Sequence, residues 1–277
     1  MTISNDRSSP ASALSPAARR FRLAPIGIIA RYALLEALRM RLAWVFLAAL
    51  GGVWALSYFA QALAIADAER LQWSFFAAGA RVVCVFMLTM FVLVSALREF
   101  HDKGLELVLS LDLPRSHYVL GKLCGFLALA WLAALPATAV LAGYAPALAV
   151  AQWGLSLGLE LSLMAALALF CIITFNQLIP AAGVVFGFYL LARTISAIQL
   201  ISVPPATTEP TVIQPLVAMA VDLVALLIPP LDQYTQTAWL VDHAAAWSTL
   251  AAQAGQAGLY VLLLAAAAMF DFYRRNL

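Results

Sequence analysis

A series of long apolar runs constrains this chain more than any other feature of its sequence. Six stretches each reach the roughly 20 residues that a helix needs to cross a hydrocarbon layer of about 30 Å. Inside that layer a helix satisfies its own backbone hydrogen bonds, whereas an isolated strand cannot. The sequence therefore predicts an all-α polytopic membrane protein with six transmembrane helices. The predicted spans are residues 42–64, 75–97, 123–145, 150–174, 178–201 and 250–270.

Composition excludes a soluble globular domain. Hydrophobic residues make up 64% of the chain and charged residues 11%, whereas a soluble domain has roughly half apolar and a quarter charged residues. Too few polar residues remain to cover a surface that faces water. Membrane lipid is therefore the expected surroundings of most of the chain, and we expect no nucleic-acid partner.

The distribution of positive charge predicts that both termini lie in the cytosol. With six spans, all but three of the 16 Lys and Arg residues fall on the side of the N-terminus; the exceptions are Arg70, Arg81 and Arg193. The long loop before the last span has four acidic residues and no Lys or Arg. This asymmetry follows the positive-inside rule. We therefore expect a multi-pass protein of the bacterial inner membrane.

The N-terminal region divides into a tail and an amphipathic stretch. Residues 1–24 are polar, and the apolar run after them is long and follows further charges, unlike a cleaved signal. We predict a disordered cytosolic tail ahead of one transmembrane domain, residues 25–277. Residues 25–41 mix apolar side chains with charges, which favours a helix at the cytosolic interface whose arginines reach the headgroups. A solvated lead-in to the first span is the alternative.

Residues 202–248 are too polar overall for another span. Their apolar patch, Pro215 to Ile228, is short, contains Asp222 and ends at a Pro-Pro pair. A seventh span here would move the basic C-terminal tail outside, against the charge bias. We therefore predict extracytosolic re-entrant or interfacial helices before the last span.

Three charged residues lie within the predicted spans. Arg81 is near the outer end of the second span, Glu160 is a little under halfway along the fourth, and Arg193 is toward the outer end of the fifth. Charges in a membrane are costly and are candidates for function. If the fourth and fifth helices pack together, Glu160 and Arg193 could form an intramembrane pair. Such a pair could be structural or could line a substrate path, and the sequence leaves both open.

Residues that could support catalysis or bind a metal form no recognisable set. Gly154 to Gly158 matches G-x-S-x-G, but that hydrolase motif needs a strand-to-helix elbow, whereas Ser156 lies inside an apolar span. Neither an H-E-x-x-H motif nor a G-x-x-x-x-G-K-[ST] phosphate loop is present. We expect Cys84, Cys124 and Cys171, which lie in apolar runs without C-x-x-C spacing, to be packing residues. We therefore expect no catalytic residue, no metal site and no ATP hydrolysis by this chain.

Three pairs of glycines have the four-residue spacing that lets helix backbones approach closely in lipid. They are Gly121 and Gly125, Gly154 and Gly158, and Gly183 and Gly187. We expect these pairs to serve helix packing and not to be a dimer motif.

The cytosolic segment 98–122 is unlike the rest of the chain. It holds eight formal charges and six leucines, and leucine alternates with other residues from Leu105 to Leu113. Alternation is typical of a strand, but a lone strand between two membrane helices would have no partner. A short helix that docks on an apolar surface is the better interpretation, with Pro114 suited to the first turn of the next helix. Many exposed leucines indicate a partner surface; an ordinary solvated linker is the alternative.

This segment resembles the loop after the second span in membrane subunits of ABC-2-type transporters. The interfacial helix, the six spans and the re-entrant structure before the last span are also similar to that family. The residues that carry the resemblance are Glu99, Lys103, Gly104, Leu113, Pro114, Arg115, Tyr118, Gly121 and Lys122. The long polar N-terminal tail departs from the family pattern.

The resemblance implies partners as well as a fold. It implies a dimer with a second copy or with a related permease, joined to two separate ATP-binding subunits that hold the ATP and Mg. Residues 99–113 would form a coupling helix that docks in a groove of the ATPase. The residues implied in coupling are Glu99, Lys103, Gly104, Glu106, Leu109, Leu113, Pro114, Arg115, Gly121 and Lys122. This chain itself would need no cofactor.

The expected function is therefore that of a permease subunit in an ATP-binding cassette exporter. Export is the commoner direction that the resemblance implies, and no residue identifies the substrate. The alternative is a channel, or a membrane assembly or scaffold protein, that is not coupled to ATP. Such a protein would not need a leucine-rich cytosolic segment. An intramembrane enzyme is disfavoured because the catalytic sets are missing.

Overall fold

The computed structural model describes residues 23–39, 41–64, 67–101, 115–202, 219, 221–225, 228–241 and 245–274. Its long helices are α1 (Leu23–Arg39), α2 (Leu42–Leu63), α3 (Ala68–His101), α5 (Arg115–Leu141), α6 (Ala147–Phe175), α7 (Leu178–Ser202) and α10 (Trp247–Arg274). Two short helices, η2 (Leu231–Gln233) and α9 (Ala238–Val241), precede α10. No strand occurs among these residues, so the predicted all-α class is confirmed.

Six of these helices are long and apolar enough to cross a membrane: α2, α3, α5, α6, α7 and α10. They correspond one to one to the six predicted spans, but most are longer. The largest differences are at α3, which begins at Ala68, and at α5, which begins at Arg115. A helix retains its hydrogen bonds beyond the hydrocarbon layer, so charged turns can extend it where hydropathy alone ends the span. Both ends of the predicted segment 98–122 are therefore helical, and residues 102–114 lie outside the described part.

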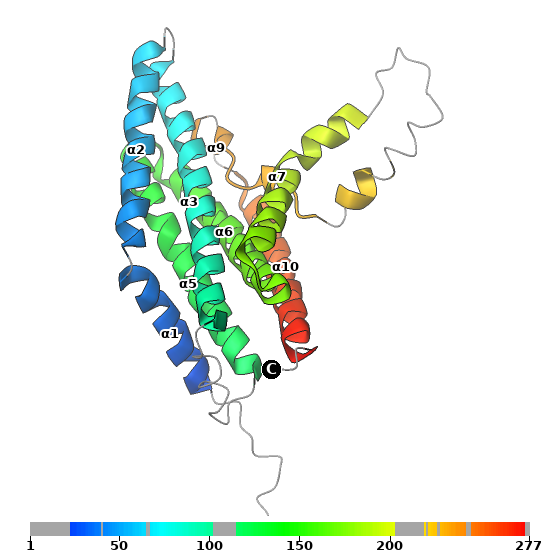
Figure 1. The fold of residues 1–277 in the computed structure, drawn as a ribbon. Helices are drawn as coiled ribbons and strands as arrows, with labels where there is room; N and C mark the ends of the chain where they lie inside the picture. Colours follow the sequence, from blue (N-terminus) through cyan, green and yellow to red (C-terminus); the bar gives the residue numbers. More distant parts are fainter. Residues whose placement is uncertain are drawn as a thin grey trace, which may run out of the picture.

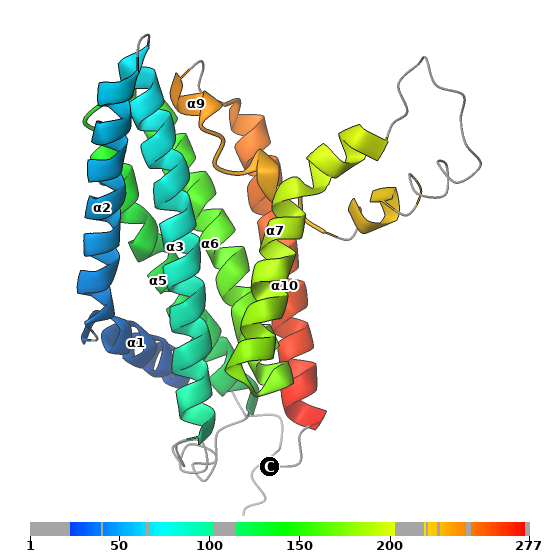
Figure 2. The ribbon, with the colours of Figure 1, turned by 45° about the horizontal axis from the view of Figure 1, so that its top comes forward.

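Helix α6 is the centre of the bundle. In its most apolar window 83% of the residues are buried, against 11% in α2, and it packs against α3, α5, α7 and α10. Figures 1 and 2 show α3, α5, α7 and α10 around it, with α2 on the outside against α3. Gly79 lets α2 approach α3, since a Cβ atom there would lie 2.6 Å from Cγ1 of Val53. The core thus lies around α6, and α2 presents most of its surface outward.

Helix α1 packs against α5 at the end of the bundle that also holds the C-terminus (Figure 2). Its first residues, Leu23 and Ala24, are helical and belong to the stretch predicted as the tail; residues 1–22 lie outside the described part. Alanines and an apolar stripe on α1 face the glycines of α5. The location of α1 beside the bundle agrees with the predicted N-terminal helix.

Residues 228–241, which include η2 and α9, form the segment that we call the outer segment. It lies against the end of the bundle opposite to the C-terminus, next to α7 and α10 in both views (Figures 1 and 2). Its residues Leu231, Tyr234, Trp239 and Leu240 are buried. Part of the region before the last span is therefore helical and packed on the bundle, where it brings polar groups to α6. Its predicted re-entrant or interfacial place in the membrane stays a prediction.

Candidate functional site

Glu160 of α6 and Arg193 of α7 face one another inside the bundle. The Glu160 side chain is fully buried, and its Oε1 lies 3.8 Å from Nη1 of Arg193. The turn between α6 and α7 explains why the two side chains meet. Asn176 ends α6 in the left-handed conformation, with φ of 52°, and reverses the chain into α7. Glu160 is 16 residues before Asn176 and Arg193 is 17 residues after it, so the two reach the same level of an antiparallel pair.

The outer segment supplies the other contacts of this ion pair. Thr235 donates a hydrogen bond from Oγ1 to Oε2 of Glu160. Arg193 donates from Nη1 to the carbonyl oxygens of Leu231, at 2.5 Å, and Tyr234, at 3.2 Å. Arg81 of α3 donates from Nη1 to the carbonyl oxygen of Thr235 at 3.2 Å. We call Arg81, Glu160, Arg193 and Thr235 the outer polar cluster; it joins α3, α6 and α7 to the outer segment.

A second set of hydrogen bonds holds Thr235 in place. Its φ of 47° is unusual for a β-branched residue and costs free energy. The Thr235 amide donates to Oγ of Ser156 at 3.0 Å, and that hydroxyl donates to Oε1 of Gln253 on α10 at 3.1 Å. Gln253 in turn donates from Nε2 to the carbonyl oxygen of Gln233 at 2.8 Å. The strained turn is therefore tied to both α6 and α10.

Tyr234 adds a contact from the same turn to α10. Its hydroxyl donates to the carbonyl oxygen of Gln253 at 2.9 Å. Burial, and then the charge of Glu160, raise the pKa of the Tyr234 hydroxyl, so it remains a hydrogen-bond donor at physiological pH. The outer segment is thus fastened by charged and neutral groups together.

Among the described residues, two buried polar atoms of the outer polar cluster make no hydrogen bond, Nε of Arg81 and Oε1 of Glu160, although the Tyr189 side chain of α7 lies near the Glu160 carboxylate. The Glu160 carboxylate faces two guanidinium groups, and Asp232 of η2 also lies near Arg193. The cluster contains no paired nucleophile and general base. Its evident effect is to hold the outer segment against three helices, and a role in lining a substrate path stays a hypothesis.

A second polar cluster lies at the opposite end of the bundle. Lys122 of α5 is 3% exposed, and its Nζ lies 2.5 Å from Oε1 of Glu99 on α3 and 3.6 Å from Oε2 of Glu36 on α1. Ser95 donates to Oε2 of Glu36 at 3.0 Å, and Tyr118 donates to Oε2 of Glu99. We call Glu36, Ser95, Glu99, Tyr118 and Lys122 the inner clamp. It ties α1, α3 and α5 together at the helix ends that flank residues 102–114.

The structure describes only part of the predicted coupling set. Glu99 and Lys122 bind one another within the chain, Gly121 packs against Ile29 of α1, and Arg115 begins α5. The remaining six lie outside the described residues: Lys103, Gly104, Glu106, Leu109, Leu113 and Pro114. The described members therefore lie on the helix ends that flank residues 102–114.

Several members of both clusters were missed from the sequence. Glu36, Ser95 and Thr235 were not singled out, nor was Gln253 beside the outer polar cluster, because uncharged polar groups and interfacial charges are common in membrane helices. One usable signal was present: Ser95 and Glu99, Tyr118 and Lys122, and Ser156 and Glu160 are polar pairs four residues apart, a spacing that puts both on one helix face. Ser156 itself sits mid-helix in α6, far from the strand-to-helix elbow that its G-x-S-x-G surroundings would need in a hydrolase.

Comparison with known proteins adds no relative. No protein-family model matches the chain, and no curated protein matches it significantly. Within the described residues, no group of three or more His, Cys, Asp or Glu side chains could hold a metal ion. The function is therefore inferred from the chain's own residues and their geometry.

Proposed function

We propose that this chain is the membrane-spanning permease subunit of an ATP-binding cassette exporter, with ATP hydrolysed by a separate subunit. The observation that carries the proposal is the charged, leucine-rich segment 98–122, whose flanking helices are joined by the inner clamp. A linker without a partner would need neither its leucines nor a rigid base. The segment resembles the coupling loop of ABC-2-type membrane subunits in the residues named above.

The inner clamp suits the transmission of a movement from the cytosol. A push on residues 99–113 would act on the last turn of α3 and the first turn of α5. Because Lys122 binds Glu99 and Glu36, α1, α3 and α5 would move as one unit. Such rigid-body movement between two states is how many transporters respond to ATP binding elsewhere.

Helix α3 extends from this clamp to the outer polar cluster. Glu99 and Arg81 lie on it 18 residues apart, which is about 27 Å along a helix. A tilt of α3 would therefore change the hydrogen bond that Arg81 donates to the Thr235 carbonyl oxygen. In the proposed cycle, ATP binding at one end releases or tightens the outer segment at the other.

The test is copurification of the permease with its ATPase. The full-length chain is extracted from its native membranes, and bound proteins are identified by mass spectrometry; a protein with a phosphate-binding loop and no spans is expected. Glu106→Lys should reduce its recovery at least several-fold, because the reversed charge lies on the docking segment. Glu69→Lys, at the opposite end of α3, is the matched control and should leave recovery unchanged.

Two results would contradict the proposal. One is recovery of the ATPase that is undiminished by Glu106→Lys combined with Glu99→Lys. The other is a stable complex with no ATPase at all, which is the outcome expected of an ATP-independent channel or scaffold. Normal membrane insertion of each variant, checked by immunoblot of the membrane fraction, separates loss of docking from loss of the protein.

A further inference from the structure

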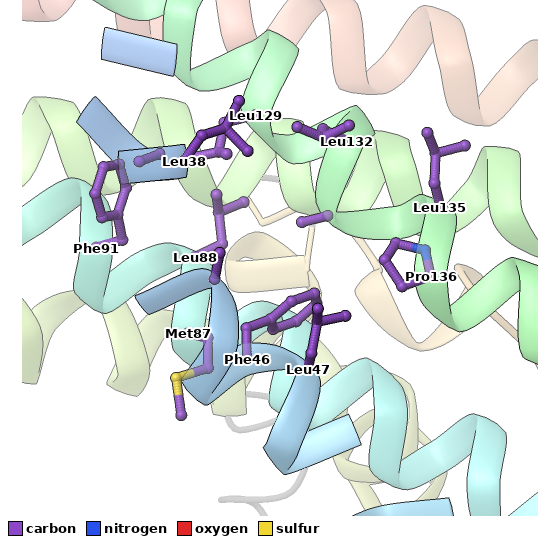
Figure 3. A pocket seen from close by; sticks show the side chains of 13 residues that line it. Leu38, Phe46, Leu47, Met87, Leu88, Phe91, Leu129, Leu132, Leu135 and Pro136 are labelled. Carbon is purple, nitrogen blue, oxygen red and sulfur yellow. The ribbon is translucent and has the colours of Figure 1, made fainter. Parts of the chain in front are cut away.

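An apolar groove opens between α2 and α5 on the outside of the bundle. It encloses about 260 Å³ and is lined by residues of α1, α2, α3 and α5, every one of them apolar. Figure 3 shows Leu38, Phe46, Leu88, Phe91 and Leu132 around this space. Helix α2 packs on α3, and the groove separates it from α5.

The groove continues along α2 and α5 past the first cavity. A second cavity of about 260 Å³ shares Leu47 and Pro136 with the first and adds Gly51, Trp54 and Val140. The α5 wall from Leu129 to Val140 is about 16 Å long at 1.5 Å per residue. One leaflet of the hydrocarbon layer is about 15 Å thick. The groove therefore has the length of one lipid chain in one leaflet.

Two residues explain why side chains do not fill this space. A Cβ atom at Gly51 would have no atom within 4 Å, so α2 leaves a gap there. Pro136 lies inside α5 and cannot donate the usual helical hydrogen bond, which loosens a helix at that point. The gap is thus built into both walls.

Two exposed arginines lie where α1 meets α2, at one end of the groove. Leu38 at the end of α1 and Ala43 at the start of α2 both line it, and Arg39 and Arg41 lie between them and are exposed. The nearest carboxylate in sequence, Glu36, is engaged by Lys122 and Ser95. Among the described residues, neither arginine has an acidic partner.

We propose that this groove holds one anionic phospholipid from the surrounding bilayer, with an acyl chain between α2 and α5 and the phosphate beside Arg39 and Arg41. An apolar groove of one leaflet's length, with two arginines at one end that have no acidic partner in the described part of the chain, matches the shape and charge of such a lipid. A second copy of the chain would bring the same positive charge to this corner. The bound lipid is distinct from any cargo, and the proposal stands whether or not the chain works with an ATPase.

The test is lipid titration of the purified full-length chain, read by native mass spectrometry. Wild type is expected to bind phosphatidylglycerol more tightly than phosphatidylcholine. Each juxtamembrane arginine contributes about fivefold in affinity for an anionic lipid. Arg39→Gln with Arg41→Gln should therefore lower the affinity for phosphatidylglycerol about 25-fold and remove the preference. The matched control is Arg274→Gln, which removes a basic residue from the last turn of α10 on the α1 side of the bundle. This variant should bind both lipids as wild type does.

Filling the groove tests the acyl-chain site separately. Two substitutions add a large side chain to the groove, Ala133→Phe on α5 and Leu47→Trp on α2. Each should displace the lipid that copurifies with the chain, whereas Ala266→Phe on the exposed face of α10 should not. Gel filtration identifies any variant that fails to fold, and two independent fillings keep the test decisive. Equal lipid retention by both filled variants would overturn the proposal, as would equal affinity for the two lipids. Efficient disulfide dimerisation of Leu47→Cys in a chain without other cysteines would also overturn it, because a second copy would then occupy the groove.

Discussion

At the scale of single residues, the ion pair between Glu160 and Arg193 is the most consequential contact. Removing one member of a buried pair leaves an uncompensated charge and costs roughly 3–5 kcal/mol. We therefore expect Glu160→Leu to lower the apparent Tm strongly, because it removes the buried carboxylate that faces both Arg81 and Arg193. The double variant Glu160→Leu with Arg193→Leu should be less destabilised than the sum of the two single variants.

Thermal unfolding in detergent, followed by gel filtration, provides the measurement. Ser162→Ala is the matched control, since Ser162 lies half a turn further along α6 and donates only to the carbonyl oxygen of Gly158. Strictly additive losses of stability would show that the two side chains do not interact as the geometry indicates.

The residue scale also shows what a sequence can and cannot predict. Glu160 and Arg193 were predicted as a pair because a charge stands out in an apolar run. Thr235, which binds Glu160, and Gln253, which helps to hold the turn around Thr235, could not be predicted in the same way. Threonine and glutamine are ordinary in and near membrane helices, and the path by which the outer segment reaches α6 follows no helical or strand period.

At the scale of elements, the three glycine pairs have different surroundings. A Cβ atom at Gly125 would lie 2.8 Å from Cβ of Ala33 and 2.9 Å from the carbonyl oxygen of Ala30, both on α1. Gly154 and Gly158 of α6 meet Thr138 and Trp131 of α5 in the same way, whereas Gly183 and Gly187 of α7 have no atom within 4 Å. We expected all three pairs to serve helix packing. The structure shows close helix contacts at the first two pairs and none at the third.

Alanine substitutions at matched glycines test this difference. Gly125→Ala should destabilise the protein by about 1–3 kcal/mol, because it forces α1 away from α5. Gly187→Ala should be neutral or should stabilise by about 0.5–1 kcal/mol, because alanine is the better helix former and space is open. Thermal unfolding of both variants in one detergent is the measurement. Equal shifts in the same direction would contradict the close approach of α1 and α5.

Helix boundaries were the part of the fold that hydropathy predicted least well. The six spans were recovered because each is a continuous apolar run. The ends of α3 and α5 were missed because their first turns carry charged residues such as Glu69 and Arg115. Helix hydrogen bonds stabilise both turns, and these bonds do not contribute to an average of hydropathy.

At the scale of the whole molecule, charge separates the two ends of the bundle. The end with α1 and the C-terminus carries Arg31, Arg39, Arg98 and Arg274, whereas the opposite end has acidic residues near the α2–α3 turn and in the outer segment. The positive-inside rule then predicts that α1 lies on the cytosolic side. An even number of spans places the last residues of α10 on the same side.

Single-cysteine labelling tests this orientation directly. In a chain whose three cysteines are changed to serine, Glu69→Cys near the start of α3 should react with a membrane-impermeant maleimide in right-side-out vesicles. Arg274→Cys at the end of α10 should react only after the vesicles are permeabilised, because the predicted orientation places this end of α10 inside. The reverse pattern would mean that the bundle is inverted, and labelling of both sites in sealed vesicles would mean an odd number of spans. Either result would also remove residues 102–114 or the C-terminus from the compartment in which an ATPase could reach them.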